Sequence, residues 1–300
     1  MLRRRIQRGL ERLIIGLLGA AAVLTILTTL GIIGILLEET RRFFIMPEVS
    51  VAEFFFSTRW EPLLGEEMHF GIWPLVCGTV LVTAVSACLA LPFGLITAIY
   101  LSEYAPARLR AVLKPALEIL AGIPTVVYGY FALAVLTPAL QRIDGSIETY
   151  NALSAGLAVG IMTLPIVTSL SEDALRAVPR SLREGAYATG ATKFDVSLKV
   201  VLPAALSGVV ASYLLAIARA VGETMIVALA AGGLARLTLD PRGQVQTMTG
   251  YMVQIFLGDT TSGGIEYRSS YAVAAALFVM TLVLTLIGQF VLARYREEYE

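Results

Sequence analysis

The chain has 300 residues, of which 57% are apolar and 15% are charged. A soluble domain usually carries about 25% charged residues, so the composition excludes an ordinary soluble protein. The formal net charge is zero, which gives no reason to expect a nucleic-acid partner. The charges are also segregated and leave long uncharged runs, and a helix of about 20 apolar residues crosses the hydrocarbon core of a bilayer. The composition therefore predicts a multi-pass membrane protein.

Six membrane-spanning helices are expected, which makes the fold all-α. Their bounds are Leu13–Leu37, Pro74–Leu101, Val112–Leu140, Ala152–Leu170, Ala204–Ala235 and Tyr271–Leu292. The first run follows a basic start, but it exceeds the roughly 7–15 apolar residues of a secretory signal. We therefore expect it to be retained as the first span.

The distribution of Lys and Arg predicts the orientation in the membrane. If the N-terminus is cytoplasmic, the inside segments hold 15 of the 23 basic residues and the outside segments hold seven. Basic residues accumulate on the cytoplasmic side, so both termini are expected in the cytoplasm. Residues 1–71 would then form a cytoplasmic start, the first span and a periplasmic loop. Residues 72–300 would form the core, with a cytoplasmic loop at 171–203.

This cytoplasmic loop carries strong helix signals. Ser181 with Glu184 three residues later is typical of a capping box. Pro179 would end the preceding helix, and Gly190 would close the new one in a left-handed conformation. A second short helix, about Lys193–Val201, is expected to stop at Pro203. The loop is therefore expected to fold into two short helices at right angles, although a hairpin that merely closes the loop would give the same signals.

The spacing in this loop resembles a known family. Glu184-Gly185-Ala186, then Gly190, Val200 and Leu202-Pro203 are similar to the EAA loop of binding-protein-dependent ABC importer permeases, with Gly185 and Val200 as mild departures. The resemblance implies a type I importer permease fold, in which the loop docks as a coupling helix into a groove of an ATP-binding subunit. It implies that Glu184 and Gly190 shape the loop, Glu184 as a helix cap. The residues that would fill the groove are Ala186, Tyr187, Thr192 and Phe194.

The chain has no phosphate-cradling GxxxxGK[ST] sequence. We therefore expect it to lack an ATPase site and to depend on two ATP-binding cassette subunits for energy. Its one histidine, His69, lies in a polar loop without other metal ligands nearby. Neither a metal nor a cofactor is expected.

Two charges interrupt the fifth expected span. Arg219 and Glu223 are four residues apart and so share a helix face. Charges inside spans are costly and usually functional, and a guanidinium can donate two parallel hydrogen bonds to an oxyanion. One interpretation places Arg219 in an anion pathway, with Glu223 positioning or releasing it. The other is a structural pair that neutralises itself or ties two helices together.

Breaks in the spans are also consistent with an anion route. Gly122-Ile123-Pro124 is expected to break the third span, and a broken helix exposes backbone N–H groups. Thr125 and Tyr128 follow and would offer hydroxyl donors. Thr163-Leu164-Pro165 predicts a similar break in the fourth span. The alternative is that these residues only kink the helices for packing.

Three segments narrow the resemblance to the C-type permeases of phosphate-specific ABC importers. These are Pro92–Ala105, Gly122–Gly129 and Arg219–Met225, the last of which includes Thr224. The resemblance implies an A-type partner permease, a periplasmic phosphate-binding protein, a bacterial inner-membrane location, and a role in transport for Arg219 and Glu223. Alternatives are a permease for sulfate or molybdate, an ion-coupled secondary transporter, and a membrane scaffold.

Overall fold

The computed structural model describes residues 2–62, 68–258 and 263–295. Four of its helices are long and apolar enough to cross a membrane, or six if each of two bent helix pairs counts as one span. The long helices are α1 (Leu2–Phe44), α3 (Trp73–Ile99), α7 (Ala152–Ala177) and α14 (Ile265–Tyr295). The number of spans expected from the sequence agrees with this all-α architecture.

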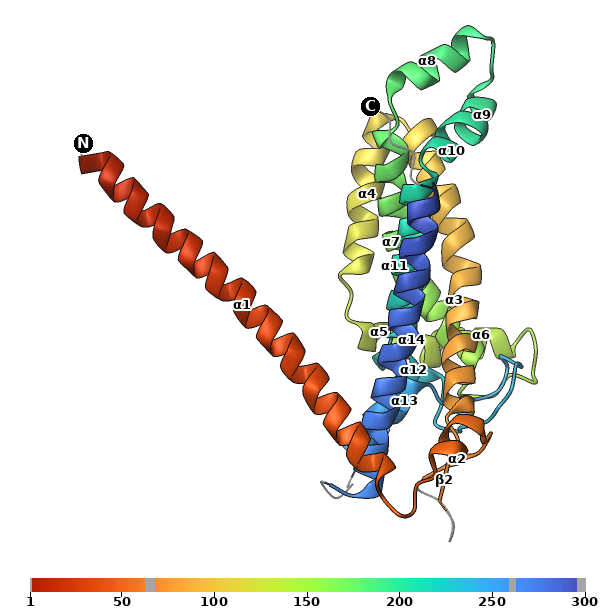
Figure 1. The fold of residues 1–300 in the computed structure, drawn as a ribbon. Helices are drawn as coiled ribbons and strands as arrows, with labels where there is room; N and C mark the ends of the chain where they lie inside the picture. The colour runs from red at the N-terminus through yellow and green to blue at the C-terminus, as the bar shows by residue number, and fades with distance from the viewer. Residues whose placement is uncertain (1, 63–67, 259–262, 296–300) are drawn as a thin grey trace.

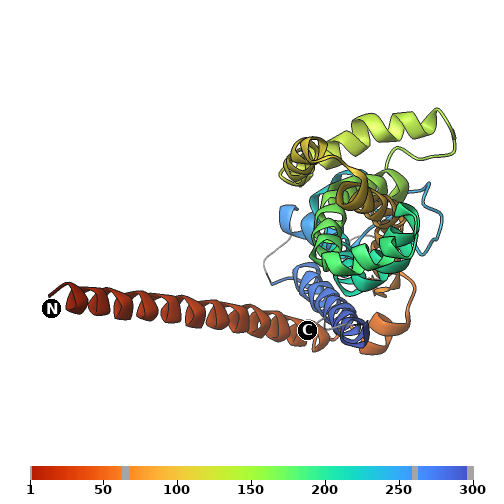
Figure 2. The same cartoon turned by 90° about the horizontal axis from the view of Figure 1, so that it is seen from above.

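Helix α7 is the centre of the bundle. In the most apolar 18-residue stretch of α7, 61% of the residues are buried. The corresponding share is 28% in the span that contains α3 and 0% in the span that contains α1. Helices α3, α4 (Ala107–Ala121) and α11 (Leu206–Val221) pack against it. Figures 1 and 2 show α1 leaving this bundle at an angle and touching it only near its C-terminal end. The apolar surface of α1 is therefore largely unpartnered within the chain.

The third span is broken as expected. After α4 the chain turns by 89° at Gly122–Pro124 into α5 (Thr125–Phe131), a π-helical turn (Ala132–Leu136) and α6 (Thr137–Gln141). Pro124 occupies the N-cap of α5 with extended backbone. A proline at this position removes no helical hydrogen bond, so the Gly-x-Pro sequence can end one helix and start the next.

The expected break at Pro165 is wrong, because α7 continues through this residue to Ala177. A hydroxyl two residues before the proline bonds to the helix backbone: Thr163 Oγ1 donates to the carbonyls of Val159, at 2.9 Å, and Gly160, at 3.2 Å. Neighbouring helices and Ser or Thr side chains allow a membrane helix to contain proline. The burial of α7 on several sides explains why it remains straight enough to continue.

The fifth span is not the single helix Ala204–Ala235 that the hydropathy predicts. Helix α11 ends at Val221, and a separate helix α12 (Met225–Ala230) follows the break at 222–224. The segment after α12 contains a further apolar helix, α13 (Met248–Leu257), where we expected only an external loop.

The segment between α1 and α3 packs against the bundle. It contains α2 (Val51–Phe56) and two short antiparallel strands, β1 (Trp60–Glu61) and β2 (His69–Phe70), with Trp60 opposite Phe70. Phe43, Phe54 and Trp60 are buried, and the Trp60 ring meets that of Tyr251 on α13 edge to face at 5.0 Å. The aromatic residues of this loop thus join α1 to α13.

Candidate functional site

The predicted coupling loop forms a helical projection at one end of the bundle (Figure 1). Helix α8 (Arg180–Ala188) ends in a left-handed glycine: Gly190 has φ +85°, its N–H donates to Tyr187 O, and Ala191 N–H donates to Ala186 O. These two bonds are those of a Schellman motif. The expected role of Gly190 at the C-terminus of this helix is therefore confirmed.

The expected capping box is wrong. Pro179 takes the N-cap position of α8, and no side chain caps this helix. Ser181 consequently lies at the second helical position. In a capping box the side chain of the N-cap residue accepts from the N–H three residues later, and Ser181 does not occupy that N-cap position. Glu184 is exposed and does not act as the cap that the resemblance implied.

The second short helix begins where expected but extends further. Thr192 is the N-cap of α9 (Lys193–Asp195): its Oγ1 accepts from Asp195 N–H at 3.2 Å and donates to Asp195 Oδ2 at 2.6 Å. A π-helical turn (Val196–Val201) and α10 (Leu202–Ala204) follow. The helix therefore passes Pro203, which lies in the first turn of α10, where a proline is tolerated. The chain bends by 71° before α11.

The other residues expected to meet an ATPase differ in exposure. Tyr187 is 42% exposed and Phe194 is 63% exposed, so both are available at the surface of the projection. Ala186 is half-buried and packs against the apolar cluster that includes Leu175 and Val196. Its side chain therefore helps to pack α8 against the bundle.

Sequence reasoning missed the arginine that holds this projection. Arg183 on α8 donates to the carbonyls of Val178, at 2.6 Å, and Leu175, at 2.7 Å, at the end of α7. It also pairs with Glu103 at 3.0 Å, and Glu103 is only 7% exposed. The basic position was visible in the sequence, but its partner lies 80 residues away and gave no local signal. Arg183 therefore links α8 to both α7 and the end of α3.

A second group of charges joins α4 to α7. Glu172 is fully buried, and Lys114 Nζ lies 2.7 Å from its Oε2 and 2.6 Å from Asp173 Oδ1. Arg110 and Arg176 approach the same Glu172 carboxylate at 3.8 and 3.5 Å. Only the pair Glu172–Arg176 has the helical spacing that a sequence can reveal.

Arg219 and Glu223 form the ion pair that their spacing predicted. Arg219 Nη1 lies 2.7 Å from Glu223 Oε2, with the arginine 42% and the glutamate 2% exposed. The other oxygen of Glu223, Oε1, accepts from the backbone N–H groups of Met225, at 3.1 Å, and Ile226, at 3.3 Å. The glutamate therefore also caps α12, so the structure contains both the ion pair and a local structural role for Glu223.

Two further residues complete this site. Arg219 Nη2 lies 3.7 Å from Met162 Sδ on α7, and Thr249 Oγ1 on α13 donates to Glu223 O at 2.6 Å. Sequence reasoning missed both, because Met162 is an ordinary core residue in a span and Thr249 lies in a segment expected to be a loop. The broken fifth span is therefore held by α7 on one side and by α13 on the other.

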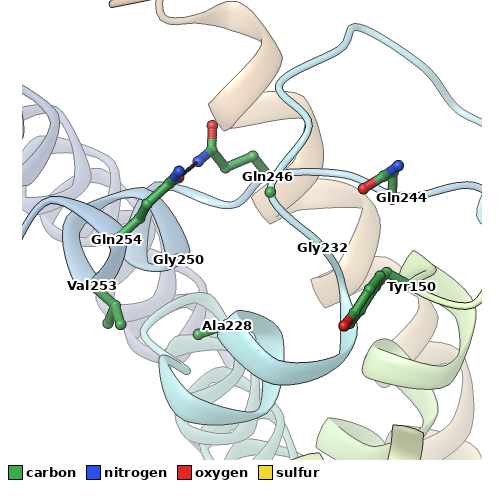
Figure 3. A pocket seen from close by; sticks show the side chains of 9 residues that line it. Tyr150, Ala228, Gly232, Gln244, Gln246, Gly250, Val253 and Gln254 are labelled. Carbon is green, nitrogen blue, oxygen red and sulfur yellow. Dashed lines mark hydrogen bonds between the residues drawn. The ribbon is translucent and has the colours of Figure 1, made fainter. Parts of the chain in front are cut away.

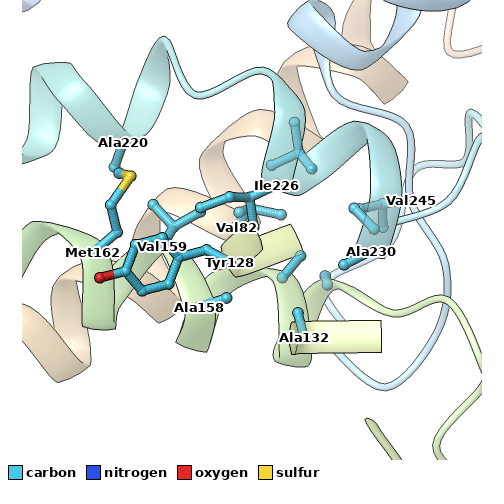
Figure 4. Close-up of a cluster of buried hydrophobic side chains, with 14 residues drawn as sticks. Val82, Tyr128, Ala132, Ala158, Val159, Met162, Ala220, Ile226, Ala230 and Val245 are labelled. Atoms are coloured by element: carbon cyan, nitrogen blue, oxygen red, sulfur yellow. The ribbon is translucent and has the colours of Figure 1, made fainter. Parts of the chain in front are cut away.

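The hydroxyl residues expected beside the pair have other partners. Tyr128 is buried next to Met162 and Ala220 (Figure 4), and its hydroxyl donates to Leu120 O at 2.7 Å. Thr224 Oγ1 donates to Gly222 O at 3.2 Å. Thr125 begins α5 and is half-buried. Tyr128 and Thr224 thus shape the two breaks by bonding to backbone carbonyls.

The two breaks lie close together in space. A Cβ added to Gly129 on α5 would approach Ile226 Cα on α12 to 3.1 Å. The short helices that follow the two breaks therefore pack closely against each other, and both contribute side chains to the buried cluster in Figure 4. Within the described residues no group of three His, Cys, Asp or Glu side chains is placed to hold a metal ion. His69 pairs with Glu53 at 2.9 Å.

Broken spans, an ion pair with a buried glutamate at one break and a helical projection at the bundle end are the features expected of a membrane permease. The chain belongs to the family described as the binding-protein-dependent transport system inner membrane component, which matches residues 90–297. It is 34% identical to a probable ABC transporter permease protein, YqgH, of Bacillus subtilis, covering 92% of this chain and 88% of that protein. It is 32% identical to the phosphate transport system permease protein PstC of Xylella fastidiosa, covering 82% and 80% of the two chains.

Solved structures support the same fold. The chain is similar to a bacterial ABC transporter involved in the import of alginate, with a TM-score of 0.67 at 14% identity, covering 94% of this chain and 96% of that one. It is also similar to the MetNI methionine ABC transporter in an inward-facing conformation, with a TM-score of 0.57 at 20% identity, covering 75% and 98%. The fold is that of a type I ABC importer permease.

Proposed function

We propose that this chain is the transmembrane permease subunit of an ATP-driven importer that carries inorganic phosphate across the inner membrane by alternating access. Relatives named phosphate transport system permease protein PstC support the substrate, among them that of Mesorhizobium japonicum, 33% identical over 80% of this chain. The observation that carries the proposal is the ion pair Arg219–Glu223 at the break of the fifth span.

The geometry of this pair suits a transient anion site. A guanidinium has five N–H donors, and Glu223 takes one of those of Arg219 at 2.7 Å. The arginine is 42% exposed in the single chain, so its remaining donors can form the parallel bonds that an oxyanion accepts. Glu223 is held by the N-terminus of α12 and offsets the positive charge, which keeps the site from trapping the anion.

The energy comes from partner subunits in this proposal. One of two ATP-binding cassette subunits docks at the projection, with Tyr187 and Phe194 as its exposed aromatic contacts. Arg183 passes their motion to α7 and to Glu103. ATP and the loaded binding protein must each prefer one orientation of the bundle, because a ligand shifts an equilibrium only by its differential affinity for the two states.

The remaining partners follow from the orientation. With α8 and both termini in the cytoplasm, the end of the bundle that bears α2, α6 and α13 faces the periplasm (Figure 1). A periplasmic phosphate-binding protein would release its ligand there. A second permease subunit, the A-type paralogue, would complete the pathway beside Arg219. The surface of α1 that has no partner within the chain would be free to contact lipid or this subunit, and residues 1–71 would act as an arm attached to the core at 72–300.

Substitution of Arg219 tests the proposal. Arg219→Gln is expected to assemble normally but to abolish ATP-driven phosphate uptake in vesicles reconstituted with all partner subunits. Arg42→Gln is a matched control, because Arg42 forms only exposed pairs at the end of α1. Uptake by Arg219→Gln at the unsubstituted rate would contradict the role of the pair. Sulfate uptake in preference to phosphate would contradict the substrate.

A further inference from the structure

Helices α12 and α13 lie towards the end of the bundle opposite α8 (Figure 1). A cavity of about 310 Å³, lined by both polar and apolar residues, lies beside these two helices. Liquid water takes about 30 Å³ per molecule, so the cavity has room for a small hydrated ion. Its wall combines three glutamine side chains and one tyrosine with glycine backbone. The polar side chains are those of Tyr150, Gln244, Gln246 and Gln254.

The side chains come from three separate segments and face one another across the cavity (Figure 3). Gln246 Nε2 donates to Gln254 Oε1 on one side. Gln244 and Tyr150 lie on the other side (Figure 3), and their side chains make no hydrogen bond to any other residue in the described ranges 2–62, 68–258 and 263–295. The cavity therefore keeps polar groups available for a ligand.

Backbone interactions fix Gln244 in this position. Its N–H donates to Glu148 Oε2 at 3.0 Å, and its carbonyl accepts from Arg236 Nε at 2.9 Å. Arg236 and Glu148 also pair with each other at 3.0 Å, so their charges are satisfied outside the cavity. Gly232 has φ +97°, and a Cβ there would come within 2.7 Å of Gln244 Cβ and 3.1 Å of Tyr150 Cβ. A residue with a side chain at this position would therefore strain the backbone and displace Gln244 or Tyr150.

The lining has no charged residue. Neutral amide and hydroxyl donors can hold an anion without the strong attraction of a full charge, and sites along a transport route must also release their ligand. An amide group both donates and accepts hydrogen bonds. It can therefore donate to the oxygens of phosphate and accept from its P–OH group, whereas sulfate at neutral pH has no proton to donate.

One short helix separates the cavity from the ion pair described above. Helix α12 starts at Met225, whose N–H donates to Glu223, and its six residues span about 9 Å at the usual rise. Thr249, which donates to Glu223 O, directly precedes Gly250 in the cavity wall. The cavity and the pair therefore lie at opposite ends of one short helix.

We propose that this cavity is an outer binding site, in which protonated phosphate from the binding protein is held by Gln244, Gln246, Gln254 and Tyr150 before it reaches Arg219. The proposal rests on the proposed function for its substrate. It assigns a location and a set of ligand groups to the transfer of phosphate from the binding protein to Arg219, which the ion pair alone does not explain.

Protection from a thiol reagent tests the site. The assembled complex carries Val253→Cys, at a position in the cavity lining that is not one of the four proposed ligands, in a chain whose Cys77 and Cys88 are replaced by serine. It is treated with a small anionic thiosulfonate, with and without ATP. Phosphate titrated into the millimolar range is expected to slow the modification at least about three-fold, the ratio for a site two-thirds occupied. Sulfate at equal ionic strength is expected to protect less. Leu239→Cys, in an exposed part of the same loop, is the control and should be indifferent to phosphate.

Variants of the lining separate ligand binding from general effects. Adding Gln244→Leu or Tyr150→Phe to the Val253→Cys chain is expected to weaken the protection, and the milder Tyr150→Phe serves if Gln244→Leu fails to fold. Equal slowing at position 239, or no protection in a complex that does take up phosphate, would overturn the outer site alone. Absence of phosphate uptake by the unsubstituted complex would instead overturn the proposed function.

Discussion

Glu223 can be tested for its two roles separately, because each of its carboxylate oxygens serves a different one. Oε2 pairs with Arg219 at 2.7 Å, while Oε1 accepts from the N–H groups that begin α12. Glu223→Gln keeps an oxygen for those N–H groups and removes the charge. Glu223→Ala removes both interactions. The two variants therefore distinguish the ion pair from the helix cap.

The expected magnitudes follow from the burial of the two partners. A hydrogen bond to a charged group contributes about 1.5–3 kcal/mol, but Arg219 is 42% exposed and can be rehydrated, so we expect Glu223→Gln to cost about 1 kcal/mol. Glu223→Ala also leaves the N–H groups of Met225 and Ile226 without the carboxylate oxygen, which costs about 1–3 kcal/mol. The alanine variant should therefore be less stable than the glutamine variant by roughly 2 kcal/mol.

Unfolding of the purified complex in detergent measures the stability difference, and phosphate uptake in vesicles measures the function. Both variants are expected to lose uptake, because each removes the charge that balances Arg219. Equal stability of the two variants would refute the capping role. Unchanged uptake by Glu223→Gln would refute the role of the ion pair, whatever the stabilities are.

Three other predictions concern the projection and the cavity loop. Gly190→Ala forces a side chain into the left-handed region, which costs about 1–2 kcal/mol, and it should weaken co-purification with the ATPase. Gly185→Ala is the control, because position 185 lies within α8 and has open space around it, and it should not weaken co-purification. Arg183→Met frees α8 from α7, so ATP hydrolysis should continue with less uptake per ATP; an unchanged ratio would contradict this. The N–H of Gln244 is the main cause that lowers the pKa of Glu148 below 4.5. The stabilisation is therefore complete above about pH 4.5 and lost as pH falls through the lower folded value. Protection of this loop from hydrogen exchange, measured relative to the intrinsic exchange rate at each pH, should therefore fall only in acid.

Local sequence signals predicted a large part of this structure. Hydropathy identified the apolar spans, and Gly122 with Pro124 identified the 89° break, because both residues act on their own backbone. The same reasoning failed at Pro165, where packing around α7 overrides the proline. It also missed the break at 222–224, which contains no proline and lies in a run that hydropathy reads as one span.

The contacts that join the elements were beyond sequence reasoning. Lys114 meets Glu172 across 58 residues of chain and Arg183 meets Glu103 across 80, and no periodicity relates such positions. The capping box failed for a different reason: Pro179 and Ser181 both carry helix-start signals, and the proline begins the helix first. Competing local signals, like long-range pairs, are resolved only by the fold.

The break that hydropathy missed is the one on which the site depends. An uninterrupted fifth helix would satisfy its own backbone and would leave Glu223 without the N–H groups of Met225 and Ile226. The interruption starts a new helix whose first N–H groups donate to the carboxylate. These hydrogen bonds offset part of the cost of placing a charge in a membrane span. Arg219 is then held near the carboxylate at one end of α12, and the glutamine-lined cavity opens at the other. The same break therefore stabilises the buried charge and sets the spacing between the two polar sites.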